Sequence, residues 1–384
     1  MKKNIKQWFD NNISYEIRYI LLLFITTRSV LIIIGVCSRI ILEPISRYKY
    51  VWVYSKHLWL DIWGVWDSGW YLSIANQWYP AIKGIASSGS TNYGFFPLYP
   101  LLMRWLGKII GGNTFVAGLI ISNLSLFVAC IFLYKLVKLK LDRSTALRSI
   151  KYLFLFPTAF ILSGVFTESL FLALLIIAFY YAEKQKWKYV GIAGFFLAIT
   201  RPIGVFIVLP IGFQYLKSKE FNFHKIKIDF SFLLFFPLGL LIFAIYTYLL
   251  TGDFFAYIHS KQIGWSFQLS NPFSIIYNSI LHGNLFSVFN IVFAIIIIIL
   301  LCVNYKKIGF SYFSLGLLAI FVPLISGGAT IIGLMRFSLI IFPLYIIAAK
   351  VTSDYKYDLL LTLVFCLLQG FLMVFWAIGS QLVV

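Results

Sequence analysis

Long apolar runs separated by short basic clusters are the feature that most constrains how this chain can fold. A helix needs about 20 mostly apolar residues to cross a bilayer, and candidate runs occupy residues 20–41, 114–134, 152–167, 168–183, 189–201, 203–216, 231–250, 286–304, 309–326, 331–349 and 358–380. Of the 384 residues, 61% are hydrophobic and 12% are charged, whereas about a quarter are charged in a soluble domain. We therefore expect one all-α domain over residues 1–384, a polytopic transmembrane bundle of about eleven helices.

The positions of the basic residues predict the orientation of this bundle. Most of the 32 lysines and arginines fall in alternate connections, at residues 2–18, 135–151, 184–188, 217–227, 306–307 and 350–356. Cytoplasmic loops carry the excess of Lys and Arg, so we expect a multi-pass protein of the plasma or inner membrane with a cytoplasmic N-terminus. An odd number of spans places the C-terminus outside. The same distribution argues against a nucleic-acid-binding role for the net charge of +19.

The two long connections on the predicted outer side, about 42–113 and about 251–285, are rich in aromatic residues. Such segments are typical of short helices that lie in the membrane interface, and loops of this length are usually functional. The runs 189–201 and 203–216 are too short to cross the bilayer alone. We expect them to form a broken hairpin that turns at Arg201-Pro202, which requires packing within protein or around a cavity.

Few carboxylates are available for chemistry on the outer side. The chain has 13 acidic residues, and eight lie among the inner cations as expected partners, which leaves Glu43, Asp61, Asp67, Glu168 and Asp253. Asp67 is the strongest candidate for a general base, because Trp66 and Trp70 would shield its carboxylate from water. The structural alternative is an N-cap at the start of an interfacial helix. Asp61 is the second candidate in this loop.

Glu168 lies between two apolar stretches, in Phe166-Thr167-Glu168-Ser169. An acidic residue at such depth is a functional candidate by default, and the alternative is a capping box formed with Thr167. Two carboxylates from separate segments can also hold a divalent metal, but no His or Cys pattern supports one here. We therefore expect no required cofactor.

Three cations on the same side fit an anionic ligand. Arg201 stands at the expected hairpin turn, Arg336 lies in the run 331–349, and Lys261 lies in the second outer loop beside His259. The arginine fork matches the geometry of phosphate oxygens. The alternative for each arginine is an extended side chain that anchors the helix at the headgroup zone.

The motifs around these residues resemble a known family. In order along about residues 60 to 345 they are Trp66-Asp67-Ser68 with Tyr71, Phe95-Phe96-Pro97, Phe156-Pro157-Thr158-Ala159, Thr167-Glu168-Ser169, Thr200-Arg201-Pro202, Gly252-Asp253-Phe254 and Arg336-Phe337. This ordered set is similar to the PIG-V-like mannosyltransferases of the GT-C membrane glycosyltransferases. Pro202 departs from the family, in which a small polar residue is common. The richness in Lys and Ile is more typical of a bacterial member.

The resemblance implies an inverting glycosyltransferase that takes a sugar, typically mannose, from a polyprenyl-phosphate donor. It implies that Asp67 is the general base, and that no nucleotide or obligatory metal is needed. The expected substrate-binding residues are Glu168, Arg201, Arg336, Lys261, Asp253, Asp61 and Tyr71. The acceptor would be a hydroxyl of an extracytoplasmic glycan, lipid or protein.

Other functions remain compatible with the residues alone. A secondary transporter places ionisable groups on broken helices, usually in two related halves, and only one such hairpin is evident here. A ligase or polymerase of lipid-linked glycans would share the carrier and the compartment, and a scaffold would perform no chemistry. The sequence names neither the sugar nor the acceptor.

Overall fold

The apolar runs fold as helices in the computed structural model, which describes residues 14–42, 52–83 and 91–382. The part of the chain so described contains no strand, which confirms the expected all-helical membrane bundle. The predicted inner lysines Lys2, Lys3 and Lys6 and the outer Glu43 lie outside the described residues.

The longest helices cover five of the predicted runs: α2 (Tyr15–Leu42), α6 (Thr114–Lys138), α12 (Phe235–Thr251), α15 (Leu285–Val303) and α20 (Tyr355–Ala377). With the 3₁₀ turn before α12 counted as part of it, these five are long and apolar enough to cross a membrane, and a sixth is added if one bent pair is a single span. Shorter helices fill most of the other predicted runs: α7 (Arg143–Leu155), α8 (Glu168–Glu183), α9 (Trp187–Ala198), α10 (Ile203–Phe206), α11 (Val208–Ser218), α17 (Phe310–Ile325), α18 (Leu334–Phe337) and α19 (Pro343–Val351). The total of about eleven crossings stays a prediction.

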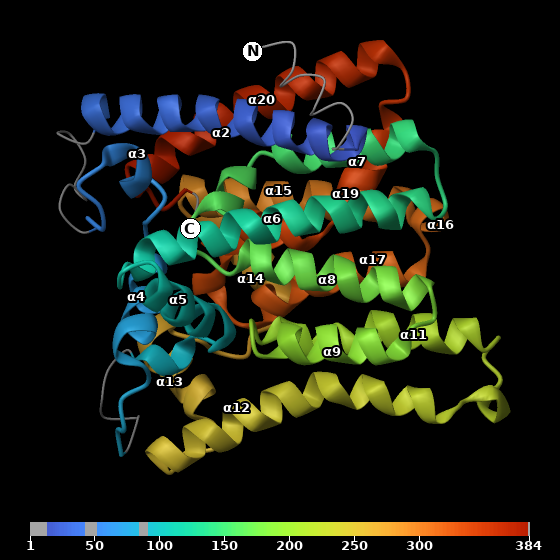
Figure 1. Cartoon of the computed structure of the whole chain (residues 1–384), viewed down its shortest axis with the longest axis horizontal. Helices are drawn as coiled ribbons and strands as arrows, with labels where there is room; N and C mark the ends of the chain where they lie inside the picture. The colour runs from blue at the N-terminus through green and yellow to red at the C-terminus, as the bar shows by residue number, and fades with distance from the viewer. Residues whose placement is uncertain (1–13, 43–51, 84–90, 383–384) are drawn as a thin grey trace.

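Short helices occupy both predicted outer loops: α3 (Leu58–Asp61), α4 (Ser68–Gln77), α5 (Leu98–Ile109), α13 (Ala256–Trp265) and α14 (Pro272–His282). In Figure 1, α3, α4, α5 and α13 gather at one end of the bundle, while α6, α8, α9 and α12 run side by side away from it. The opposite end carries α11 and the one-turn helix α16 (Tyr305–Ile308). The end that carries α4 is called the outer end below, following the predicted orientation.

At the opposite end, the expected pairing of inner acids with inner cations is confirmed for several residues. Lys151 lies 2.6 Å from Asp358, and Arg143 lies 3.0 Å from Glu16. Further pairs are Lys140–Glu183, Lys225–Glu220 and Lys219–Asp229. These carboxylates are therefore occupied away from the outer end.

The run 152–167 was expected to be one helix, and this prediction is wrong. α7 ends at Leu155 because Phe156 precedes Pro157 and takes an extended conformation. The chain continues irregularly through the 3₁₀ turn Ala159–Ser163 to Thr167. The likewise expected continuous helix 331–349 is bent by 67° between the segments Thr330–Ile340 and Pro343–Val351.

Side chains from neighbouring helices satisfy the irregular segment 156–167, as buried backbone in a membrane requires. Gln369 Nε2 donates to the carbonyl oxygens of Phe154 and Phe156, at 2.9 and 3.0 Å. Arg28 Nη2 donates to Ala159 O at 3.1 Å. Gln369 and Arg28 are both buried. The segment is therefore held in place although it is not helical.

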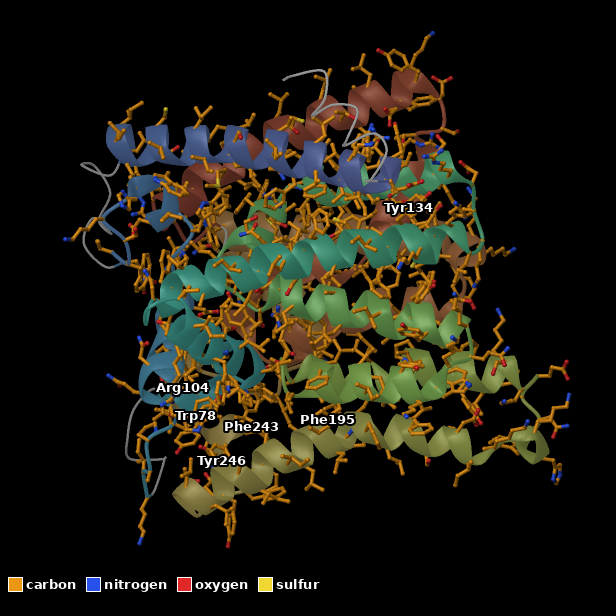
Figure 2. All side chains as sticks on the ribbon, in the orientation of Figure 1. Trp78, Arg104, Tyr134, Phe195, Phe243 and Tyr246 are labelled. Atoms are coloured by element: carbon orange, nitrogen blue, oxygen red, sulfur yellow. The ribbon has the colours of Figure 1, made fainter. Side chains whose placement is uncertain are left out.

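Close packing of α9 on α12 depends on glycines. A Cβ added to Gly194 would lie 2.2 Å from the Phe236 ring, and one added to Gly239 would lie 2.7 Å from the Phe195 carbonyl oxygen. Small residues allow helix backbones to approach closely in membranes. Figure 2 shows Phe195 on α9 facing α12.

An aromatic contact joins the first outer loop to the outer end of α12 (Figure 2). The indole N–H of Trp78 donates to the Tyr246 hydroxyl, and the Arg104 guanidinium lies 5.8 Å from the Trp78 ring centre. Phe96 packs on Phe243 with 4.7 Å between ring centres. The loop that carries Asp67 is thus fastened to a membrane helix.

Candidate functional site

The first outer loop and the end of the irregular segment are bonded to each other, which brings Asp67 beside Glu168. Val165 N donates to Trp63 O at 3.1 Å, and Ser68 Oγ donates to Val165 O at 3.2 Å. Trp66 has a left-handed backbone with φ of 50°, which is uncommon for a bulky residue. This turn directs the chain into α4 with Asp67 as the preceding residue.

Four side chains form a continuous chain of charges, here called the acid–arginine chain: Asp67, Arg336, Glu168 and Arg201. Arg336 Nη1 donates to Asp67 Oδ2 at 2.8 Å, and Arg336 Nε lies 3.3 Å from Glu168 Oε1. Arg201 Nη1 donates to the same Glu168 oxygen at 2.8 Å. The first outer loop and three segments far apart in the sequence therefore contribute side chains to the same cluster.

Exposure differs along this chain of charges. The Glu168 side chain is 2% exposed, while those of Arg201 and Asp67 are 13% and 18% exposed. Oδ1 of Asp67 has no hydrogen bond within the described residues, whereas Oδ2 is bonded to Arg336. Glu168 is therefore an internal link, and Asp67 presents a free carboxylate oxygen at the accessible end.

The capping alternatives for the two carboxylates do not match this geometry. Asp67 occupies the N-cap position of α4, but its side chain makes no cap hydrogen bond. Thr167 at the N-cap of α8 makes none either, so no capping box forms around Glu168. Both carboxylates instead face arginines.

Breaks in the helices place the two arginines. Arg201 lies between α9 and α10, and Gly204 allows the turn, since a Cβ there would lie 2.2 Å from Leu197 O. Arg336 lies on the one-turn helix α18 within the bent pair. The Phe337 ring is shared, with its centre 5.3 Å from the Arg201 guanidinium and 5.2 Å from that of Arg336. Neither arginine is a headgroup anchor alone, because each bonds a carboxylate.

Lys261 approaches this cluster from the second outer loop. Its Nζ lies 4.0 Å from the Trp265 ring centre and 4.5 Å from that of Phe95. Burial lowers the pKa of Lys261 to about 8, with the Asp67 charge opposing this and the two arginine charges adding to it. Among the described residues, no carboxylate lies within ion-pair distance of its ammonium group. The three cations outnumber the two carboxylates, so the cluster carries one positive charge in excess.

Tyr71 lines the same region from α4. Its hydroxyl lies 3.4 Å from Thr167 Oγ1, and burial, followed by the Asp67 and Glu168 charges, raises its pKa well above the ordinary value. The phenol therefore stays protonated at physiological pH. It can donate a hydrogen bond but cannot act as a base.

The structure does not bring Asp61 into the cluster. Its Oδ2 accepts from Arg39 Nη1 at 2.6 Å, and its Oδ1 accepts from the backbone N–H groups of Tyr54 and Ser55 at 2.6 and 2.8 Å. Asp61 and Arg39 are both buried. All of these contacts join the loop to the end of α2, which is a structural arrangement.

Asp253 is likewise occupied locally. Its Oδ2 lies 2.6 Å from His259 Nδ1, and its Oδ1 accepts from Phe255 N at 2.8 Å. These bonds stabilise the start of α13, the helix that carries Lys261.

No group of three or more His, Cys, Asp or Glu side chains that could hold a metal ion occurs in the described ranges. The sequence interpretation did not identify the buried polar residues Arg28, Asn290 and Gln369, and it gave Thr158 no role beyond the family motif. For Asn290 and Gln369 a signal is visible in retrospect, because each is a polar residue within an apolar run.

No protein-family model matches the chain, and no curated protein matches it. The chain is similar to two solved structures of the oligosaccharyltransferase of Archaeoglobus fulgidus, each at 14% identity. The complex with zinc and sulfate matches with a TM-score of 0.44, over 92% of this chain and 53% of the other. The form tethered to an acceptor peptide containing the NVT sequon matches with a TM-score of 0.45, over 98% and 56%. The chain spans about half the length of these structures.

Proposed function

We propose that this membrane protein is a GT-C-type glycosyltransferase that transfers a sugar from a polyprenyl-phosphate donor to a hydroxyl group of an acceptor. The observation that carries the proposal is the acid–arginine chain with Lys261 beside it, a cluster with excess positive charge in which Asp67 Oδ1, at the accessible end, has no hydrogen bond within the described residues. Mannose is the sugar that the sequence resemblance favours. The donor and acceptor faces are extracytoplasmic in the orientation that the basic loops predict.

The reaction needs a base for the attacking hydroxyl. In the proposed mechanism, Asp67 accepts the hydroxyl proton at Oδ1 while the hydroxyl oxygen attacks the anomeric carbon. The bond from that carbon to the phosphate oxygen breaks, and the electron pair leaves with the lipid phosphate. Arg336 holds the other oxygen of Asp67 at 2.8 Å and so fixes the direction of the free one.

The leaving phosphate gains charge, which fixed cations stabilise. Of the three cations in the cluster, Lys261 is the one without a carboxylate partner among the described residues, so it is assigned the closest contact with the phosphate. Arg336 and Arg201 add to the positive field, although each already bonds a carboxylate. The sequence interpretation instead favoured the two arginines as the phosphate clamp, with Lys261 assisting.

The test is transfer of radiolabelled mannose from polyprenyl-phosphate mannose by the purified protein and by Asp67→Asn. Loss of a general base lowers turnover by about 10²- to 10⁴-fold, whereas binding of polyprenyl phosphate should stay within a few-fold of wild type. Glu220→Gln, at an exposed inner pair, is the matched control. Unchanged transfer by Asp67→Asn would overturn the proposed mechanism.

A transporter or scaffold gives a different result in the same experiment. Neither would transfer sugar from the donor, and flux of the lipid across vesicles by a transporter would not depend on a base at Asp67. A glycan ligase or polymerase would transfer only from a pyrophosphate-linked glycan. Comparison of the two donors therefore separates the alternatives.

A further inference from the structure

The one-turn helix that carries Arg336 is held by side chains from two other parts of the molecule. Both backbone polar groups of the preceding residue, Met335, are bound in this way. Met335 N donates to Asn290 Oδ1 at 3.1 Å, and Met335 O accepts from Thr158 Oγ1 at 3.2 Å. Ser338 Oγ also donates to this carbonyl, at 2.6 Å. Asn290 and Thr158 are completely buried.

Such support is needed because α18 is only four residues long. The first amides and last carbonyls of a helix lack partners within the helix, and in one turn nearly every group is terminal. Neighbouring 3₁₀ turns, Gly328–Gly333 and Ser338–Ile340, do not extend it regularly. The position of Arg336 therefore depends on contacts from outside its own segment.

Thr158 connects the two broken segments of the bundle. It lies on the irregular segment that precedes Glu168, and its hydroxyl donates to Met335 O in the segment that carries Arg336. The segments that lead to Glu168 and Arg336 are therefore joined by this bond as well as by the ion pair between the two side chains. The proposed reaction gives no other role to the Phe156–Ala159 motif.

Asn290 completes the arrangement from α15. Its Oδ1 is bound to Met335, and its Nδ2 donates to Phe286 O at 3.0 Å. Asparagine within an apolar membrane helix is costly unless its amide is satisfied by a neighbouring segment. Here both ends of the amide are satisfied, one of them by the helix that carries Arg336.

We propose that Thr158 and Asn290 are positioning residues that fix the Arg336 guanidinium between Asp67 and Glu168. The guanidinium must meet two carboxylates at once, at 2.8 and 3.3 Å, and a functional group displaced by about 1 Å loses much of its effect. The consequence for ligand binding rests on the proposed function. The positioning itself does not.

The first experiment measures positioning without any substrate. Hydrogen exchange is followed by mass spectrometry on peptides that cover residues 328–340, in wild type, Thr158→Val, Thr158→Ser and Asn290→Leu. Thr158→Val replaces the hydroxyl with a methyl group of similar size, so exchange should accelerate about tenfold, the equivalent of one lost hydrogen bond. Asn290→Leu should do the same, and Thr158→Ser should restore the wild-type rate.

The matched control is Thr247→Val on α12, which deletes an equally buried threonine hydroxyl bonded to Ala244 O at 3.0 Å. It should leave the exchange of residues 328–340 unchanged. Wild-type exchange in Thr158→Val, or equal acceleration in Thr247→Val, overturns the positioning role. If Asn290→Leu does not fold, the exchange rate of Thr158→Val alone decides whether the positioning role holds.

The second experiment is a double-mutant cycle on binding of polyprenyl phosphate to the purified protein. Thr158→Val should weaken binding about tenfold in the wild-type background. In an Arg336→Gln background it should weaken binding by less than about twofold, because the route through Arg336 is gone. If Thr158→Val weakened binding by the same factor in both backgrounds, its effect would be a general structural one, and the inference would be overturned. If wild type does not bind polyprenyl phosphate, the proposed function fails and the exchange experiment alone decides positioning.

Discussion

Arg336 Nη1 donates to Oδ2 of Asp67 over 2.8 Å, although 269 residues separate the two in the sequence. The same guanidinium places Nε 3.3 Å from Glu168. One cation thus lies between two carboxylates that belong to different segments. The guanidinium therefore places a positive charge next to each carboxylate and joins the first outer loop to the start of α8.

Arg336→Gln should destabilise the protein and abolish most activity. Removing one partner of a buried ion pair leaves an uncompensated charge and costs about 3–5 kcal/mol. We expect a lower midpoint of thermal unfolding in detergent and a fall in kcat/KM of more than about 100-fold.

Asp67→Asn added to Arg336→Gln should recover part of the lost stability, because Asp67 loses its ion-pair partner in Arg336→Gln whereas Glu168 keeps Arg201. It should not recover activity, since the fixed cation is still missing. A double variant that is less stable than Arg336→Gln alone would contradict the pairing of Arg336 with Asp67.

Lys261 should make anion binding depend on pH. Its pKa of about 8 means that its charge is lost as pH rises through that value, whereas a phosphate monoester remains a dianion above about pH 7. The affinity for polyprenyl phosphate should therefore fall between about pH 7 and 9. Binding by Lys261→Arg should not fall over this range, because arginine stays charged. Equal pH profiles for the two proteins would exclude Lys261 from the site.

The same lysine predicts the pH dependence of stability. Its folded pKa of about 8 lies below the ordinary lysine value of 10.5, so the unfolded state binds more protons between these values. The free energy of unfolding should therefore rise with pH over this window, relative to Lys261→Met. Thermal midpoints of both proteins at about pH 7.5 and 10 measure this difference. A difference of opposite sign would contradict the lowered pKa.

Asp61→Ala should reduce stability far more than Asp253→Ala. Asp61 accepts three bonds and pairs with the buried Arg39, so its loss costs about 3–5 kcal/mol. The Asp253–His259 pair is partly exposed, and such pairs contribute about 1 kcal/mol or less. Thermal unfolding midpoints compare the two. An Asp61→Ala protein of wild-type stability but without activity would instead indicate direct contact of Asp61 with substrate.

The contact of Trp78 with Tyr246 should appear as coupling in a double-mutant cycle. Tyr246→Phe leaves the Trp78 indole N–H without its acceptor, at a cost of about 1–3 kcal/mol. Trp78→Phe in the Tyr246→Phe background should cost less than it does alone. Additive changes in the free energy of unfolding would contradict the hydrogen bond.

The helical class and most element positions were predictable because they depend on local composition. Apolar runs of about 20 residues have few alternatives to a membrane helix, and the break at Arg201-Pro202 followed from a local proline. The break at Phe156-Pro157 had the same signal, but the apolar residues on both sides of this proline led to the prediction of one continuous helix over 152–167. The irregular segment persists because Gln369 and Arg28 satisfy its carbonyls. Neither residue is near it in sequence.

The sequence by itself determined that the chain is a helical membrane bundle, and it selected a short list of charged residues with Asp67, Glu168, Arg201, Arg336 and Lys261 among them. Only the tertiary structure decided which of these meet. It joined Asp67 to Arg336 and separated Asp61, although Asp61 lies six residues from Asp67 and Arg336 lies 269 residues away. The physical reason is that hydropathy acts along the chain, whereas pairing of buried charges depends on which helices pack and where they break.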